Sequence, residues 1–145
     1  MSDTNKTFLG NGLGWPLDKG LGTEMPSGPI TTDNSGALVR AGYEESVRQA
    51  VWLILSTAPG ERLMRPTFGC GIHELVFAPL TDATISRVIE SVHSALLTFE
   101  PRIDVRSVRV NPGSDGELLI DIQYEVRTTN NVFNLVYPFY LQGAA

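Results

Sequence analysis

The spacing of apolar residues changes once along this chain, from the period of a helix before residue 100 to the period of a strand after it. Two segments repeat apolar residues at i, i+3, i+4 and i+7, which predicts two helices that each bury one face. The first runs from Tyr43 to the Pro59-Gly60 break, and the second runs from Thr81, a candidate N-cap, to Phe99. The apolar stripes are Val47, Ala50, Val51, Ile54 and Leu55 in the first helix and Ile85, Val88, Ile89, Val92 and Leu96 in the second.

Three later segments alternate between apolar and polar residues, as half-buried strands do. We expect strands at 103–110, 118–126 and 132–140, joined by Asn-, Gly- and Thr-containing turns at 111–116 and 128–131. In the first strand the apolar positions change parity between Val105 and Val108, which predicts a β-bulge. The predicted fold class is therefore α+β, with two helices packed on a small antiparallel three-stranded meander.

The first part of the chain carries neither period. Residues 1–36 are rich in Gly and Pro, so we interpret them as an extended glycine-rich N-terminal arm and 37–145 as a single α+β domain. The arm is either a disordered tail or a segment that orders on contact with a partner. Its large apolar side chains, among them Phe8, Leu13 and Trp15, favour docking.

Charge and composition exclude several classes of protein. The chain has 145 residues, a net charge of -5 and a pI of about 4.9, so it lacks the basic footprint that nucleic acid requires. No apolar run approaches the ~20 residues of a membrane span, and the start lacks a secretion signal, which predicts assembly in the cytoplasm. One cysteine and two isolated histidines provide no metal-ligand spacing, so we expect neither metal nor cofactor.

Cys70 is the first catalytic candidate to weigh. A nucleophilic cysteine needs a base and a group that orients the base, and only His73 stands near it in sequence. A small buried thiol is the better interpretation.

A glycosidase is the second enzymatic possibility, because such enzymes need one protonated and one ionised carboxyl group. Glu61 and Glu100 are candidates by position alone. Each has an arginine close by in sequence, Arg62 and Arg102, and a guanidinium in contact stabilises the ionised form that a general acid must avoid. We therefore expect no catalysis.

Two separated motifs stand out: PGERLMRPTFGCG at 59–71 and the tripeptide Glu100-Pro101-Arg102. With these motifs in this order, the chain resembles the small wedge proteins of contractile-tail baseplates. That family occurs in phages, type VI secretion systems and extracellular injection particles, and is often called lysozyme-like. The resemblance extends from about Phe8 to Phe139 and departs chiefly in the long glycine-rich arm and at 76–79.

The resemblance implies a structural, non-enzymatic role in a six-fold symmetric baseplate around an inner tube. Larger wedge subunits would hold the chain, inner tube or hub proteins are further possible neighbours, and sheath subunits would add strands to its sheet. Two alternatives stay open at this point. One is a peptidoglycan-degrading glycosidase in the baseplate, and the other is a generic adaptor with no connection to tails.

The resemblance also implies that Glu100, Pro101 and Arg102 contact the wedge partners. The residues themselves suggest a local ion pair, because the helix dipole penalises Glu100 at a C-terminus and Arg102 can compensate for it. Arg62 and Arg65 are candidates for the same partner contact, or for pinning their own loop.

The last predicted strand is best placed at an edge of the sheet, because Pro138 has no N–H to give to a second neighbour. Exposed edges recruit other strands, so we assign Asn134, Tyr137 and Pro138 to the contact with an incoming sheath strand. The alternative is that the N-terminal arm, through 8–15, folds back and covers this edge.

Overall fold

A computed structural model describes residues 11–13, 34–38, 40–114 and 116–142. The chain divides into two compact units, Met1–Ala50 and Val51–Ala145. Most of the predicted N-terminal arm lies outside the described residues, so its boundary at residue 36 stays a prediction.

The described part of the first unit contains a short antiparallel pair of strands. β1 (Asn11–Leu13) pairs with β2 (Arg40–Gly42), and Asn11 lies opposite Gly42. Helix α1 (Tyr43–Ser56) begins directly after β2 and extends into the second unit. Glu44 and Glu45 occupy its first turn, where the positive end of the helix dipole stabilises negative charge.

The two predicted helices are confirmed, with small differences at their ends. Helix α1 ends at Ser56, three residues before Pro59, where the Thr57 hydroxyl donates to the carbonyl of Leu53 at 2.7 Å. Helix α2 (Asp82–Phe99) has the predicted cap, because the hydroxyl of Thr81 accepts a hydrogen bond from the backbone N–H of Thr84. A short 3-10 helix, η3 (Gly71–Leu75), lies between them in sequence.

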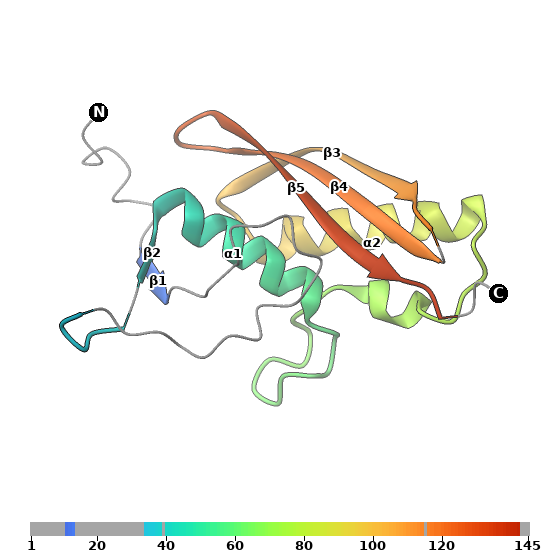
Figure 1. Cartoon of the computed structure of the whole chain (residues 1–145), viewed down its shortest axis with the longest axis horizontal. Coiled ribbons are helices and arrows are strands. Elements are labelled where there is room, and N and C mark those ends of the chain that lie inside the picture. Colours follow the sequence, from blue (N-terminus) through green and yellow to red (C-terminus); the bar gives the residue numbers. More distant parts are fainter. Residues whose placement is uncertain (1–10, 14–33, 39, 115, 143–145) are drawn as a thin grey trace. The chain divides into compact units, whose positions relative to one another are not determined.

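The second unit contains the predicted antiparallel meander, in the order β3 (Ile103–Pro112), β4 (Glu117–Val126) and β5 (Asn131–Tyr140) (Figure 1). The predicted bulge is present, since Val105 lies opposite Tyr124 and Ser107 opposite Gln123, which leaves Arg106 without an opposite residue. The fold is α+β, and β5 lies at an edge of this sheet as Pro138 predicted.

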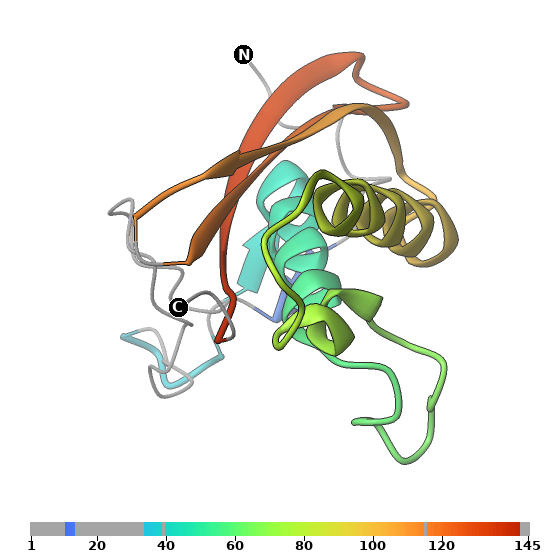
Figure 2. The same ribbon diagram turned by 90° about the vertical axis from the view of Figure 1, so that its right-hand side faces the viewer.

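The core of the second unit lies between one face of the sheet and α2, which runs along that face (Figure 2). The inward positions of β4, Leu118, Ile120, Ile122, Tyr124 and Val126, are all fully or almost fully buried. On the apolar stripe of α2, Val88, Val92 and Leu96 are also fully buried. On β5, Tyr137 meets the ring of Trp52 edge to face, with 4.9 Å between the ring centroids.

Candidate functional site

Residues 58–69 form a loop between α1 and η3, which we call the tip loop. Its base is closed by a hydrogen bond from the N–H of Cys70 to the carbonyl of Thr57 at 2.9 Å. A second bond joins the N–H of Gly60 to the carbonyl of Pro66 at 2.7 Å. The carboxylate of Glu61 accepts from the N–H of Ala58 at 2.9 Å. These bonds satisfy backbone groups locally and fix the path of the loop.

Gly69 allows the base of the tip loop to close. Its φ is +128°, a conformation that L side chains rarely adopt, and a Cβ atom there would lie 2.3 Å from the carbonyl oxygen of Thr57. The close approach of the two ends of the loop, at Thr57 and at Gly69, therefore requires glycine.

Phe68 holds the two arginines of the tip loop. The Arg62 guanidinium carbon lies 4.5 Å from the centroid of the Phe68 ring, and that of Arg65 lies 5.9 Å from it. At these distances a cation is attracted by the face of the ring. Phe68 is itself buried and packs on Phe99, with 5.1 Å between ring centroids.

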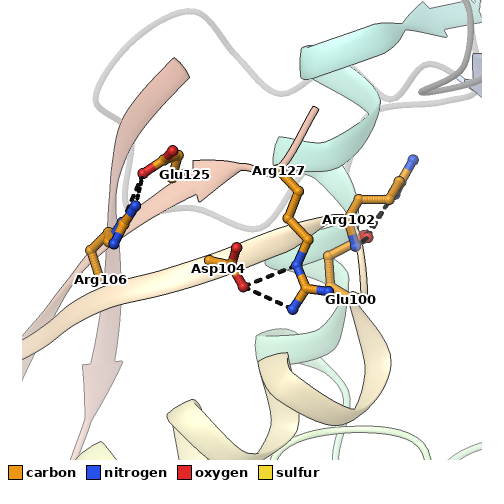
Figure 3. Close-up of polar contacts among 6 residues, drawn as sticks. All are labelled: Glu100, Arg102, Asp104, Arg106, Glu125 and Arg127. Atoms are coloured by element: carbon orange, nitrogen blue, oxygen red, sulfur yellow. Dashed lines mark hydrogen bonds and ion pairs between the residues drawn. The ribbon is translucent and has the colours of Figure 1, made fainter. Parts of the chain in front are cut away.

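The end of α2 carries a buried ion pair. Glu100 is 3% exposed, and its carboxylate accepts hydrogen bonds from Arg102 Nε at 2.7 Å, from Nη2 at 2.6 Å and from the backbone N–H at 3.3 Å (Figure 3). This is the two-point geometry that a guanidinium and a carboxylate favour. The hydrogen bonds that Arg102 donates to Glu100 raise the pKa of the Arg102 guanidinium above its ordinary value, so the cation is permanent.

The backbone of Arg102 is fixed as well, because its carbonyl accepts from the N–H of Arg127 at 3.0 Å. Next along β3, Asp104 pairs with the Arg127 side chain at 2.8 Å (Figure 3). Arg106, the bulge residue, pairs with Glu125 of β4. Asp104 and Arg106 of β3 are thus each paired with a charge on β4 or on the turn after it.

The contact of Phe68 with Phe99 brings the two sequence motifs together, because Phe99 is followed directly by Glu100. Neither phenylalanine was predicted to belong to the site. Leu63 and Met64 were not predicted either, and they lie in the tip loop with 94% and 93% of their surfaces exposed. Two adjacent large apolar residues inside a Pro- and Gly-bounded charged segment were the available signal.

The hydrogen-bond alternation of the β4–β5 ladder shows which backbone groups face the edge. One residue beyond the pair of Glu117 and Tyr140, Leu141 donates its N–H to the carbonyl of Gly116 at 2.9 Å. Bonded and non-bonded pairs alternate in an antiparallel ladder, so the odd-numbered residues of β5 bond to β4. The backbone groups of Val132, Asn134, Val136 and Pro138 therefore face away from β4.

The residues predicted on β5 fall into two groups. Asn134 and Pro138 face the edge, as a contact with an incoming strand requires. Tyr137 is 7% exposed, packs on Trp52 and directs its N–H toward β4, so its side chain supports the strand from the core side. Burial raises the pKa of its hydroxyl to about 12.

The enzymatic candidates do not form a catalytic arrangement. Cys70 is fully buried, and burial raises the pKa of its thiol, which keeps the sulfur protonated and unreactive. His73 donates through Nε2 to the carbonyl of Leu55 at 2.8 Å. Among the described residues, no cluster of three His, Cys, Asp or Glu offers a metal site, and no helix is long and apolar enough to cross a membrane.

An α+β domain with these two motifs together at the end of α2 has the features of the baseplate wedge proteins that the sequence resembles, a class of structural subunits in contractile tails. A family model described as "Baseplate wedge protein gp25" matches residues 41–131, and the chain belongs to that family.

Three individual proteins show how similar this chain is to known tail components. The baseplate wedge protein gp25 of Enterobacteria phage T4 is 33% identical over 82 residues, which are 56% of this chain and 62% of that protein. A protein of Geobacter sulfurreducens, whose crystal structure is described as that of a candidate tail lysozyme, is 49% identical in sequence. The match covers 75% of this chain and 100% of that chain, with a TM-score of 0.69. A chain in the postcontracted baseplate of pyocin R2 is 28% identical over 75% of this chain and 94% of that chain, with a TM-score of 0.51.

Proposed function

We propose that this baseplate subunit is the piece on which the tail sheath begins, by adding a sheath strand to the side of β5 that faces away from β4. The observation that carries the proposal is the outer side of β5, where Val132, Asn134 and Val136 each direct an N–H and a carbonyl away from β4. In the part of the chain that the structure describes, β4 is the only strand paired with β5. An extended segment would satisfy these groups by β-augmentation.

The other edge of the sheet is built differently. Strand β3 carries the bulge at Arg106 and charged side chains, such as Asp104, that pair with neighbours on β4 and the turn after it. Bulges and charges are the devices by which soluble proteins protect an edge. On β5, the outward Val132 and Val136 are 62% and 42% exposed, and the inward residues are also apolar. A strand that is apolar on both faces is typical of a sheet interior, which favours β5 as the accepting edge.

We also propose that larger wedge subunits hold the chain through the joined motifs. The exposed groups there are Pro101, the guanidinium of Arg102 and the arginines of the tip loop, Arg62 and Arg65. Glu100 is too deeply buried for extensive contact and acts by holding Arg102 in place. We further propose that the subunit is arranged with six-fold symmetry around an inner tube and contacts tube or hub proteins. Its assembly into the baseplate would take place in the cytoplasm.

The proposed role requires no catalysis. Glu100 is engaged by Arg102 on both carboxylate oxygens, and Glu61 lies in the exposed tip loop with one oxygen bonded to Ala58. Glycoside hydrolysis needs a carboxyl group that is free to give a proton to the leaving oxygen, and the Glu100 carboxylate is engaged by Arg102. Purified protein should not release fragments from peptidoglycan, and hydrolysis that is abolished by Glu61→Gln or Glu100→Gln would overturn this part of the proposal.

The test of the edge is a backbone substitution with a matched side-chain control. Asn134→Pro removes an edge-facing N–H, whereas Asn134→Ala removes the same side chain and keeps the N–H. We expect both variants to fold and to enter baseplates, and only the alanine variant to start sheath, as seen by electron microscopy of assembled particles. If sheath grows from baseplates carrying Asn134→Pro but not from those lacking residues 1–19, the N-terminal arm is the sheath contact instead.

A further inference from the structure

We propose that Leu63 and Met64 are the anchor by which the tip loop inserts into an apolar socket of a larger wedge subunit, and that carboxylates line the rim of that socket. The inference rests on the proposed function, because it names the contact that holds this chain among its wedge partners. It assigns to these two residues the burial of apolar surface in the partner, which the charged arginine side chains around them cannot provide.

The tip is the most exposed apolar surface in the described residues. Leu63 and Met64 are 94% and 93% exposed, whereas the next most exposed large apolar side chain, Phe77, is 76% exposed. Single exposed apolar residues are common on soluble proteins, but two adjacent ones at a protruding tip form a compact knob. Figure 2 shows the segment, in green, extending away from the sheet and from α2.

The loop is built to hold this knob outward. The bonds from Cys70 to Thr57 and from Gly60 to Pro66 close the loop below the tip, and the Arg65 N–H donates to the Arg62 carbonyl at 3.2 Å across it. The apolar pair therefore cannot fold back onto the core without breaking backbone hydrogen bonds. A rigid knob binds at lower entropic cost than a flexible one, because little freedom is lost on docking.

The charges beside the knob indicate the chemistry of the partner. Arg62 and Arg65 flank Leu63 and Met64, and both guanidiniums are held over the ring of Phe68. Glu61 bonds to Ala58 below the tip, so the loop presents a positive collar on a chain whose net charge is -5. Guanidiniums in fixed positions favour carboxylates, so we expect Asp or Glu around the socket.

The surface next to the tip loop is concave. Gly69, Gly71 and Phe99 border an open hollow of about 380 Å³, whose other walls are further side chains of α2. The lining residues of α2 are Glu90, Ser91, Ser94, Ala95 and Thr98. A partner that receives the knob can continue into this hollow and reach the end of α2.

The central experiment uses a double variant that carries both Leu63→Ser and Met64→Ser. Phe77→Ser is the matched control for the loss of an exposed apolar side chain. The full chain is co-expressed with the wedge subunits of its own particle, and the affinity for the purified wedge complex is measured. Burying a large apolar side chain contributes enough that its loss weakens binding about tenfold or more. We expect a loss of about a hundred-fold for the double variant and no change for the control.

A second arm tests the collar. Arg62→Ala with Arg65→Ala should weaken binding and reduce its sensitivity to salt, because exposed charges are screened at high ionic strength. The lysine pair Arg62→Lys and Arg65→Lys keeps the charge but loses the planar stacking on Phe68, so it should retain the salt dependence at reduced affinity. A photo-crosslinker at position 63 should label an apolar wedge segment with Asp or Glu nearby.

The outcomes separate this inference from the proposed function. If wild-type chain binds no wedge complex, the proposed function fails. If wild-type and the Leu63→Ser, Met64→Ser variant bind equally well, the anchor inference alone is wrong. Two further results would overturn it: a concentration-dependent dimer of the purified chain that the serine variant abolishes, or tip-dependent sedimentation with anionic phospholipid vesicles.

Discussion

Glu100 and Arg102 form a two-point ion pair at the end of α2 in which only the arginine reaches solvent appreciably. The Arg102 side chain is 32% exposed, while that of Glu100 is 3% exposed. An ion pair on the surface contributes little to stability. When one member is buried the pair contributes more, because loss of the cation leaves a buried negative charge without a partner. The pair is therefore a structural element first, and it presents Arg102 to a partner second.

The first prediction is that Arg102→Ala lowers the free energy of unfolding by about 3 kcal/mol or more, because it leaves the Glu100 carboxylate buried and uncompensated. Replacing both residues with leucine should restore most of the loss, since well-packed apolar groups can substitute for such a pair. Urea denaturation of the variants, with unchanged dependence on denaturant, measures both effects. An Arg102→Ala midpoint equal to that of wild type would show that solvent reaches the carboxylate freely.

The leucine pair is also the informative variant for assembly. We expect it to fold without the guanidinium, so failure to enter baseplates would report on partner contact and not on stability. Alanine at both positions is a poorer choice, because the cavity it leaves lowers stability in addition to removing the charge.

The second prediction concerns the two left-handed glycines of the tip loop. Gly69→Ala should destabilise the second unit by about 3 kcal/mol or more, because the new Cβ meets the Thr57 carbonyl in addition to the strained φ. Gly60→Ala, with φ +87° and open space around its Cβ, should cost about 1 kcal/mol. Thermal unfolding of the two variants provides the comparison, and equal losses would mean that the close approach at Gly69 relaxes without cost.

The hydrophobic period was sufficient to predict α2 and the three strands of the second unit, but not the short helix η3. The stripe of α2 and the alternation of β4 are produced by one buried face each, and the parity change at Val105 could arise only from an extra residue. Pro138 placed β5 at an edge for a covalent reason, the missing N–H, which does not depend on tertiary context.

The candidate site was less accessible to prediction, because it depends on which residues cover which. The tripeptide identified Glu100 and Arg102, yet the burial of Glu100 follows from its packing in the folded domain. The apolar residues of the tip loop follow no regular spacing, so neither its closed shape nor the stacking of the arginines on Phe68 could be predicted from the sequence. Tyr137 is a different case. We assigned it to the contact with a sheath strand, but it has the same parity as Leu135 and Phe139, and all three side chains are buried in the core.

The third prediction is a loss of stability in alkaline solution caused by Tyr137. Burial raises the pKa of its hydroxyl to about 12, above the ordinary value of 10 for an unfolded tyrosine. The folded state therefore holds its proton where the unfolded state releases it, and stability falls as the pH rises from about 10 to about 12. Tyr137→Phe should reduce this slope in pH-dependent urea denaturation. A slope that is the same in the phenylalanine variant would assign the alkaline transition to other groups.

The last prediction is that Pro138 protects the chain against pairing with itself. Along the outer side of β5 the N–H groups of Val132, Asn134 and Val136 form a row, and Pro138 is the next position of the same parity. A proline there interrupts the row, which limits an incoming strand to the half of β5 nearer the turn after β4 and weakens chance pairing between two copies.

Pro138→Val restores the missing N–H beside an exposed valine at position 136 without disturbing the bonds of β5 to β4. We expect this variant to fold and to form dimers that depend on concentration, as measured by sedimentation velocity, while wild-type chain stays monomeric over the same range. Adding Asn134→Pro to Pro138→Val should return the chain to a monomer, because it interrupts the extended row at a second edge-facing position. If Pro138→Val stays monomeric at the highest concentrations, the side chains of β5 or the N-terminal arm already protect the edge, and the proline serves only the local path of the strand.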